Sequence, residues 1–355
     1  MDLRVEKLLI LAAKQACEAA YITKAENIFY LSGFTSGQDA SLFISPEKQY
    51  LLTDGRYVEQ AQQECPDWDI VEVNSLAAID KLPSLGIKYK RIAFEAHNIS
   101  YSHYLALEAA LPNRWQTTEK LTESLRLIKS AEELDLLRKS AAISDQVFTD
   151  IAASLAPGTR EDDLAEQIRV LLKKYGCTGE AFATIVLTGV NASRPHGQPG
   201  STPFSEGDMV TMDYGGIYHH YVADMTRTVA IGKADRKLAD YYAVVLEAQM
   251  KGLDTIKAGV PVATVDNTVR GVLSKYNLEA FFAHSTGHGI GLEIHEDPKL
   301  SKNVEGILQT GMVVTIEPGI YIPGWGGIRI EDSVIVTGNG HERITRSDKH
   351  LLIFE

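Results

Sequence analysis

The chain has 355 residues, of which 45% are hydrophobic and 23% charged, a composition typical of a globular protein with room for two domains. Its 35 basic and 47 acidic residues give a net charge of -12, which argues against nucleic acid or an anionic membrane as a partner. Its three cysteines lie far apart and form no Cys-x-x-Cys pair, which favours a reducing compartment.

The beginning of the chain predicts an amphipathic helix rather than an export signal. The apolar run from Leu8 to Ala13 is short, and Lys7 and Lys14 flank it. No segment approaches the ~20 consecutive apolar residues that a membrane span requires. We therefore expect a cytoplasmic protein without a membrane partner.

Residues 1–120 alternate strand and helix patterns, which predicts an α/β layer with a mixed sheet. Strand character is found at residues 21–23, 41–44, 50–53, 68–71 and 91–94. A hairpin turn is expected at Ser45–Gln49. The polar cluster Asp54–Tyr57 is interpreted as a helix start with an Asp/Arg pair rather than as a substrate contact.

A capping box marks the start of the next long helix. The Ser130 hydroxyl can accept from the amide of Glu133, while the Glu133 carboxylate reaches back. Apolar residues then recur every three or four positions up to Leu155, where a Pro-Gly pair ends the pattern. We place the domain boundary just before this helix, which predicts domains over residues 1–123 and 124–355.

The second domain contains an internal repeat. A helical pattern that ends at Gly176 has a counterpart that ends at Asn277, and both residue types tolerate a positive φ. The strand pattern Gly207–Asp213 recurs at Gly311–Glu317, with an acid at the same step. Two similar α/β units that face each other would bring the acids of both halves together.

Acids within apolar or β-branched strand patterns are the first candidate ligands. Asp213 and Asp224 come from the first half, and Glu317 and Glu331 come from the second. A carboxylate buried in a strand is costly unless it is paired or bound to a cation. Four such acids and one histidine form a ligand set that two divalent metals can share.

A histidine-rich stretch at residues 283–296 supplies the imidazole. It holds three histidines and two acids around three closely spaced glycines. This density indicates metal binding or proton transfer, and glycines let the backbone approach whatever is held there. A dinucleotide-binding loop is excluded, because no capped helix follows. A second pair, His219-His220, predicts a hairpin turn, with an extra metal contact as the alternative.

In order and local context these residues resemble the ligands of the pita-bread metallopeptidases, which include methionine aminopeptidase, aminopeptidase P and prolidase. The five matching residues are Asp213, Asp224, His288, Glu317 and Glu331. The run from His284 to Glu296 is similar to the signature of the proline-specific branch, and the resemblance covers the whole chain. It implies an α/β (α+β) fold, in which a small amino-terminal α/β domain precedes a pseudo-symmetric pita-bread catalytic domain.

The resemblance also implies how the ligands share two divalent metal ions. Asp224 and Glu331 would bridge both ions. Asp213 would complete the coordination of the first ion, and His288 and Glu317 would complete that of the second. Carboxylates can bridge because each has two oxygens, whereas a neutral imidazole binds one ion. The oxygen-rich set suits Mn²⁺ first, with Co²⁺ or Zn²⁺ as alternatives.

The same resemblance assigns catalytic and pocket residues. Glu317 would move a proton from the attacking water to the leaving nitrogen, and His295 would donate to the developing oxyanion. His196 is expected to contribute to catalysis from the wall of the substrate pocket. His284 would also line the pocket, with a supporting position behind the ligands as the alternative. Arg329 shares a strand face with the last ligand and would orient acids or substrate.

The expected activity is hydrolysis of the peptide bond before proline, whose nitrogen carries no hydrogen. The sequence favours an Xaa-Pro aminopeptidase that acts on longer peptides, with an Xaa-Pro dipeptidase, or prolidase, as the alternative. Lys299 is a candidate partner for the free carboxylate of a dipeptide, and equally an exposed loop residue. The intact ligand set disfavours a non-catalytic peptide-binding module and creatine hydrolysis. We expect a homodimer that binds proline-containing peptides.

Overall fold

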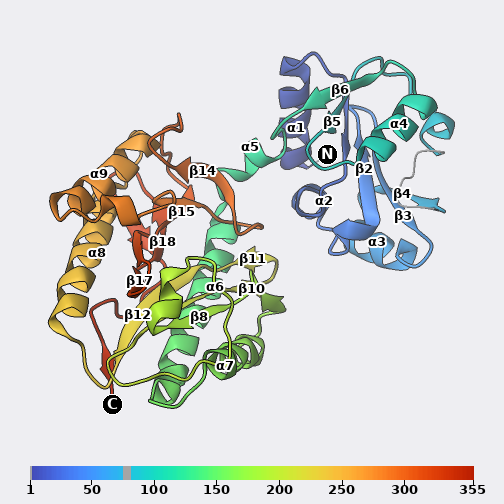
Figure 1. Ribbon diagram of the computed structural model, residues 1–355. Coiled ribbons are helices and arrows are strands. Elements are labelled where there is room, and N and C mark those ends of the chain that lie inside the picture. The colour runs from blue at the N-terminus through green and yellow to red at the C-terminus, as the bar shows by residue number, and fades with distance from the viewer. Residues whose placement is uncertain (1, 75–80) are drawn as a thin grey trace. The chain divides into compact units, whose positions relative to one another are not determined.

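The computed structural model describes residues 2–74 and 81–355 and divides the chain into two compact units, Met1–Arg126 and Leu127–Glu355 (Figure 1). The boundary that the sequence suggested after residue 123 lies within α5 (Glu123–Arg126), the last helix of the first unit. Across both described ranges, no helix combines the length and the apolar character that a membrane crossing needs.

The first unit is built on a six-stranded sheet in the order β4-β3-β2-β1-β5-β6. Its strands are β1 (Ala19–Ile22), β2 (Ala40–Ile44), β3 (Gln49–Asp54), β4 (Asp69–Val73), β5 (Ile92–Glu95) and β6 (Trp115–Thr118). Antiparallel pairing joins β2 to β1 and β3, and the other pairs are parallel, which confirms the mixed sheet. The edge strand β6 was not predicted, because its partly exposed side chains give a weak hydrophobic signal.

Helices lie between several strands of the first unit, as the sequence pattern predicted. Besides α5 they include α1 (Leu3–Lys14), α2 (Ala25–Ser32), α3 (Val58–Glu64) and α4 (Tyr101–Ala110). The first helix buries Val5, Leu8 and Ala12 on one face, which confirms an amphipathic helix. Arg56 donates to both carboxylate oxygens of Asp54, at 2.9 and 2.7 Å, just before α3 begins. The polar cluster is therefore a paired helix start.

The second unit begins with the predicted capping box. The amide of Glu133 donates to Ser130 Oγ at 3.3 Å, and the Glu133 carboxylate accepts from the Ser130 amide at 2.8 Å. The helix α6 (Ala131–Asp150) ends earlier than predicted. A 3₁₀ turn at Ile151–Ser154 follows it, and the row of buried apolar residues continues through this turn to Leu155. Three further long helices follow: α7 (Glu161–Lys174), α8 (Arg236–Thr255) and α9 (Val262–Lys275).

The strands of the second unit form two main sheets, in the orders β20-β12-β9-β8 and β14-β13-β15-β18-β19, with smaller ribbons β11-β10-β7 and β16-β17. Their bounds are β7 (Gly179–Glu180), β8 (Ile185–Thr188), β9 (Met209–Tyr214), β10 (Gly216–Tyr218), β11 (Tyr221–Val222), β12 (Met225–Ile231), β13 (Gly287–Gly289), β14 (Glu296–Leu300), β15 (Val313–Ile316), β16 (Gly319–Ile322), β17 (Gly326–Arg329), β18 (Asp332–Val336), β19 (His341–Arg343) and β20 (Ile353–Phe354). Figure 1 places these strands between α6 and α7 on one side and α8 and α9 on the other.

The internal repeat is present in three dimensions. The chain leaves α7 through Gly176 and α9 through Asn277, at φ values of 98° and 59°. The equivalent strands β9 and β15 each pair antiparallel with the third strand after them, β12 and β18 respectively. One apolar core lies under α6 and α7, and another under α8 and α9. The candidate ligands come from the strands between these cores.

Candidate metal centre

The four acids lie where strands of the two halves begin or end. Asp213 is within β9, Asp224 directly precedes β12, Glu317 directly follows β15, and Glu331 lies between β17 and β18. The expectation that all four lie inside strands is wrong for the last three. Backbone bonds to neighbouring segments hold two of these positions, since Glu317 N donates to Thr286 O at 2.8 Å and Glu331 N to Thr226 O at 3.2 Å.

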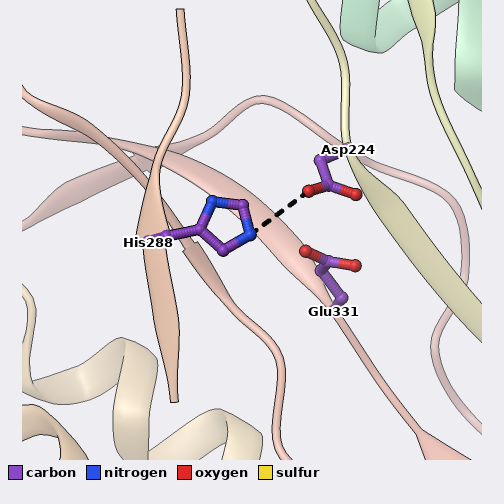
Figure 2. A group of neighbouring side chains, drawn as sticks. All are labelled: Asp224, His288 and Glu331. Carbon is purple, nitrogen blue, oxygen red and sulfur yellow. Dashed lines mark ion pairs between the residues drawn. The ribbon is translucent and has the colours of Figure 1, made fainter. Parts of the chain in front are cut away.

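Three candidate ligands form a compact group (Figure 2). The ligand atoms of Asp224, His288 and Glu331 all lie within 4.8 Å of one another. His288 Nε2 is 3.5 Å from Asp224 Oδ2 and 3.2 Å from Glu317 Oε1. The other ring nitrogen, Nδ1, lies 3.0 Å from the carbonyl of Gly289, which can only accept. A neutral His288 therefore carries its hydrogen on Nδ1 and directs the lone pair of Nε2 at the acids.

Arg329 joins the remaining acid to this group. Its Nη2 donates to Asp213 Oδ2 at 2.7 Å, and its Nε donates to Thr226 Oγ1 at 3.0 Å. The Thr226 hydroxyl in turn donates to Glu331 Oε2 at 2.7 Å. One guanidinium thus fixes one oxygen of each of two acids. The second oxygens, Asp213 Oδ1 and Glu331 Oε1, are buried without a hydrogen-bond partner.

The electrostatics of the acids fit a cation site. Burial raises the pKa of Asp224 and of Glu331 well above the ordinary range, and neighbouring carboxylates add to the effect. Burial also raises the pKa of Asp213, although Arg329 opposes it. A divalent cation among these groups would remove their repulsion and satisfy the two unpartnered oxygens. A set of carboxylates with one imidazole is also a donor set that first-row divalent metals accept.

Glu317 differs from the other acids. Burial disfavours its charge, but the hydrogen bond and charge of His288 hold its pKa at about 2. Correspondingly, Glu317 raises the pKa of His288 against the effect of burial. The carboxylate of Glu317 is therefore ionised at neutral pH, which suits a metal ligand.

His284 has both ring nitrogens engaged by the protein. Its Nδ1 lies 2.9 Å from the carbonyl of Ser285, and its Nε2 lies 2.8 Å from the hydroxyl of Tyr321. The same hydroxyl accepts from Arg329 Nη1 at 2.8 Å. Burial lowers the pKa of His284, so that the ring is neutral. These contacts agree with the alternative expectation, a supporting position behind the ligands.

His295 and His196 lie exposed at the edge of the group. The ring of His295 packs edge-on against His288, with the ring centroids 4.4 Å apart. Burial of part of the ring and the charge of His288 lower the pKa of His295, and His196 lies close enough to add to the shift. Arg329 also reaches towards this side, since its Nη1 lies 3.5 Å from the carbonyl of Pro195. Contacts, in part through Thr226, join eight of the nine residues that the resemblance assigned to the site, and His196 lies near them without a contact to the group.

His219 and His220 form the turn of the hairpin between β10 and β11. Both have a positive φ, 46° and 71°, and Tyr218 pairs with Tyr221 across the turn. Two consecutive residues of this kind are typical of a two-residue hairpin turn. The predicted turn is confirmed.

Thr226 and Tyr321 are site residues that the sequence reasoning missed. Thr226 connects Arg329 to Glu331, and Tyr321 connects Arg329 to His284. A signal for Tyr321 exists in Gly319, because a Cβ at that glycine would lie 2.4 Å from the tyrosine hydroxyl. The sequence alone does not show that this glycine lies against the tyrosine. The pairing of the two strands of the ribbon has to be known first.

Family models match most of the chain. The model described as metallopeptidase family M24 matches residues 135–338. The model described as the creatinase/prolidase N-terminal domain matches residues 4–128. The two matches fall on the second and first compact units, respectively.

Solved structures of similar fold are named as proline-specific peptidases. An Xaa-Pro dipeptidase from Bacillus anthracis is 37% identical, with 99% of each chain covered and a TM-score of 0.94. A prolidase from Pyrococcus horikoshii is 31% identical, with 99% of this chain and 100% of that chain covered and a TM-score of 0.94. An X-Pro aminopeptidase from Thermotoga maritima is 33% identical, with 98% and 99% covered and a TM-score of 0.90.

Proposed function

Because the chain belongs to metallopeptidase family M24, we propose that it cleaves the peptide bond before proline and that Xaa-Pro dipeptides are its main substrates. The observation that carries the chemistry is the compact group of Asp224, His288 and Glu331. Glu317 contacts His288, and Asp213 and Glu331 each have one buried oxygen without a hydrogen-bond partner. The specificity for proline follows from full-length relatives that are named Xaa-Pro dipeptidase and prolidase.

We propose that the acids hold two divalent ions, with Mn²⁺ as the first choice and Co²⁺ or Zn²⁺ as alternatives. Asp224 and Glu331 would contribute to both ions. Asp213 would complete the coordination of one ion, and His288 and Glu317 would complete that of the other. The unpartnered oxygens of Asp213 and Glu331 support this assignment, because each needs a donor or a cation. Bound ions of this kind lower the pKa of a water and polarise a carbonyl.

The residues around the ions would divide the proton transfers between them. Glu317 would accept the proton of the attacking water and pass it to the leaving nitrogen. His295 has a lowered pKa, so its neutral ring would donate a hydrogen bond to the oxyanion. His196 would support the oxyanion side of the pocket from the edge at which it lies.

Substrate length depends on the space beyond the proline. Lys299 is exposed on β14, the strand that follows His295, and an ammonium there would pair with the free carboxylate of a dipeptide. An Xaa-Pro aminopeptidase acting on longer peptides is the second candidate, favoured by the likeness to the Thermotoga maritima enzyme. The sequence alone favoured this second candidate, whereas the relatives support a dipeptidase at least as well.

The deciding measurement is kcat/KM in Mn²⁺ for one Xaa-Pro dipeptide and for the same dipeptide extended by one residue. We expect the dipeptide to be preferred about tenfold, a difference of about 1.4 kcal/mol. Equal or faster cleavage of the longer peptide would assign an aminopeptidase, and cleavage only after an amino-terminal methionine would refute the specificity for proline.

A matched pair of variants tests the carboxylate contact. Lys299→Met should raise KM for the dipeptide and leave the longer peptide unaffected. Lys302→Met removes a nearby exposed charge that lies beyond the strand and serves as the control. Equal kinetics of both variants with the dipeptide would remove Lys299 from substrate binding.

A further inference from the structure

The segment that carries His295 has little regular structure of its own. Residues 291–295 form bends between β13 and β14, and His295 is exposed. Two backbone bonds hold its beginning: Gly291 N donates to Glu293 O at 3.1 Å, and Val222 N donates to Gly291 O at 2.9 Å. The direction of the His295 ring therefore depends on what fixes the rest of the segment.

The carboxylate of Glu296 closes this segment on itself. Its Oε1 accepts from the amides of Leu292 and Glu293, at 2.9 and 3.2 Å. The carboxylate lies against Gly291, where a Cβ would approach both of its oxygens to 2.6 Å. The last glycine of the histidine-rich stretch thus leaves room for the acid that follows His295. Backbone and side chain together form a small loop with the histidine directly before its closing residue.

A lysine near the start of the second unit balances the charge of Glu296. Lys129 Nζ lies 3.0 Å from Glu296 Oε2, and the two side chains are only 2% and 6% exposed. The lysine backbone is itself fixed, because its amide donates to Gly311 O at 3.0 Å. Removing one partner of such a buried ion pair leaves an uncompensated charge, which the remaining carboxylate relieves by taking up a proton or by moving towards water.

We propose that Lys129 is a positioning residue for His295, acting through the Glu296 carboxylate that holds the segment 291–296. The proposal rests on the proposed function, because His295 matters through Xaa-Pro turnover. Without the ammonium, the Glu296 carboxylate takes up a proton or shifts, and its bonds to the amides of Leu292 and Glu293 weaken. The segment then loosens, and the His295 ring loses its fixed position beside His288.

Kinetics of three single variants test this role. With an Xaa-Pro dipeptide, Lys129→Met should lower kcat about 10- to 100-fold, the usual effect of losing a residue that orients a metal-site group, with KM and metal content near wild type. Lys129→Arg keeps the charge and should retain most of kcat. Arg138→Met, on the helix α6 that follows Lys129, breaks the ion pair with Glu342 at 2.7 Å and should leave kcat unchanged.

A double-mutant cycle separates positioning from general damage. If Lys129 acts through His295, Lys129→Met should cause no further loss of kcat in a His295→Ala background. Losses that multiply would overturn the proposal. A Lys129→Met variant with wild-type kcat would overturn it too.

Amide hydrogen exchange across residues 290–296 gives a readout that needs no substrate. Exchange should be faster in Lys129→Met than in wild type and unchanged in Arg138→Met. Unchanged exchange in Lys129→Met would overturn the proposal. A wild-type protein that fails to cleave any Xaa-Pro peptide would refute the proposed function, and the exchange rates alone would then decide whether Lys129 holds the segment.

Discussion

Replacing Lys349 by methionine probes a buried charge network directly behind the last candidate ligand. Lys349 Nζ donates to Asp332 Oδ2 at 2.6 Å and to Gln249 Oε1 at 2.8 Å. Asp332, the residue after Glu331, also accepts from Arg227 Nη2 at 2.8 Å. The Asp332 side chain is fully buried and that of Lys349 is 7% exposed, so water cannot replace the lost ammonium.

The magnitude follows from what the substitution leaves behind. Methionine fills a similar volume, so the loss is mainly electrostatic. One of the close cations of Asp332 disappears, and Gln249 Oε1 loses its donor. Asp332 keeps its bond to Arg227, so the cost is that of leaving a buried polar group without its partner, about 1–3 kcal/mol. In a unit of this size about 1 kcal/mol lowers Tm by about 2–4 °C, so Lys349→Met should melt about 2–12 °C below wild type.

Differential scanning calorimetry of both proteins at pH 7 measures the shift. The control is Lys233→Met, which removes an exposed pair with Glu206 at 3.0 Å, where both side chains are more than 60% exposed. Exposed pairs contribute up to about 1 kcal/mol, so the control should melt within about 4 °C of wild type. A Lys349→Met protein that melts no lower than this control would refute the argument from burial.

Three further outcomes test the metal centre. Asp224→Ala should lose both ions more readily than Asp213→Ala, because only a bridging ligand serves two cations; metal analysis after dialysis decides, and equal retention would contradict the bridge. His295→Ala should keep its metals and lose about a hundredfold to a thousandfold in kcat, as when one oxyanion donor is removed; a value within about threefold of wild type would exclude His295 from the mechanism. Metal binding to the metal-free protein should release more protons as the pH falls, because burial raises the pKa values of Asp224 and Glu331; calorimetric heats that do not depend on the buffer at mildly acidic pH would count against this.

Features that are encoded locally could be predicted from the sequence. The capping box at Ser130 needs only two residues at a fixed spacing, and its hydrogen bonds are present. The repeat that relates Gly176 to Asn277 rests on backbone geometry that only certain residues tolerate. The turn at His219-His220 follows from pairing between adjacent strands.

Contacts between distant segments could not be predicted in this way. Thr226 bonds to Glu331, and Lys129 to Glu296, across more than a hundred residues of chain, and no spacing rule connects them. The ends of strands were also missed, because the apolar pattern that marks a strand continues past the last ladder bond. The acids just beyond β15 and β17 were therefore placed inside strands, although their positions depend on bonds to other segments.

With the proposed ions bound between the two halves, the availability of metal would also affect the lifetime of the protein. Each half contributes two carboxylates, so a shared cation fastens one half to the other and has no equivalent site in an opened chain. A ligand at about 100 times its Kd adds about 2.7 kcal/mol to the stability of the form that binds it. In a cell depleted of divalent metal, the two halves of the second unit would separate more often. Proteases would then cleave the chain first where the halves meet.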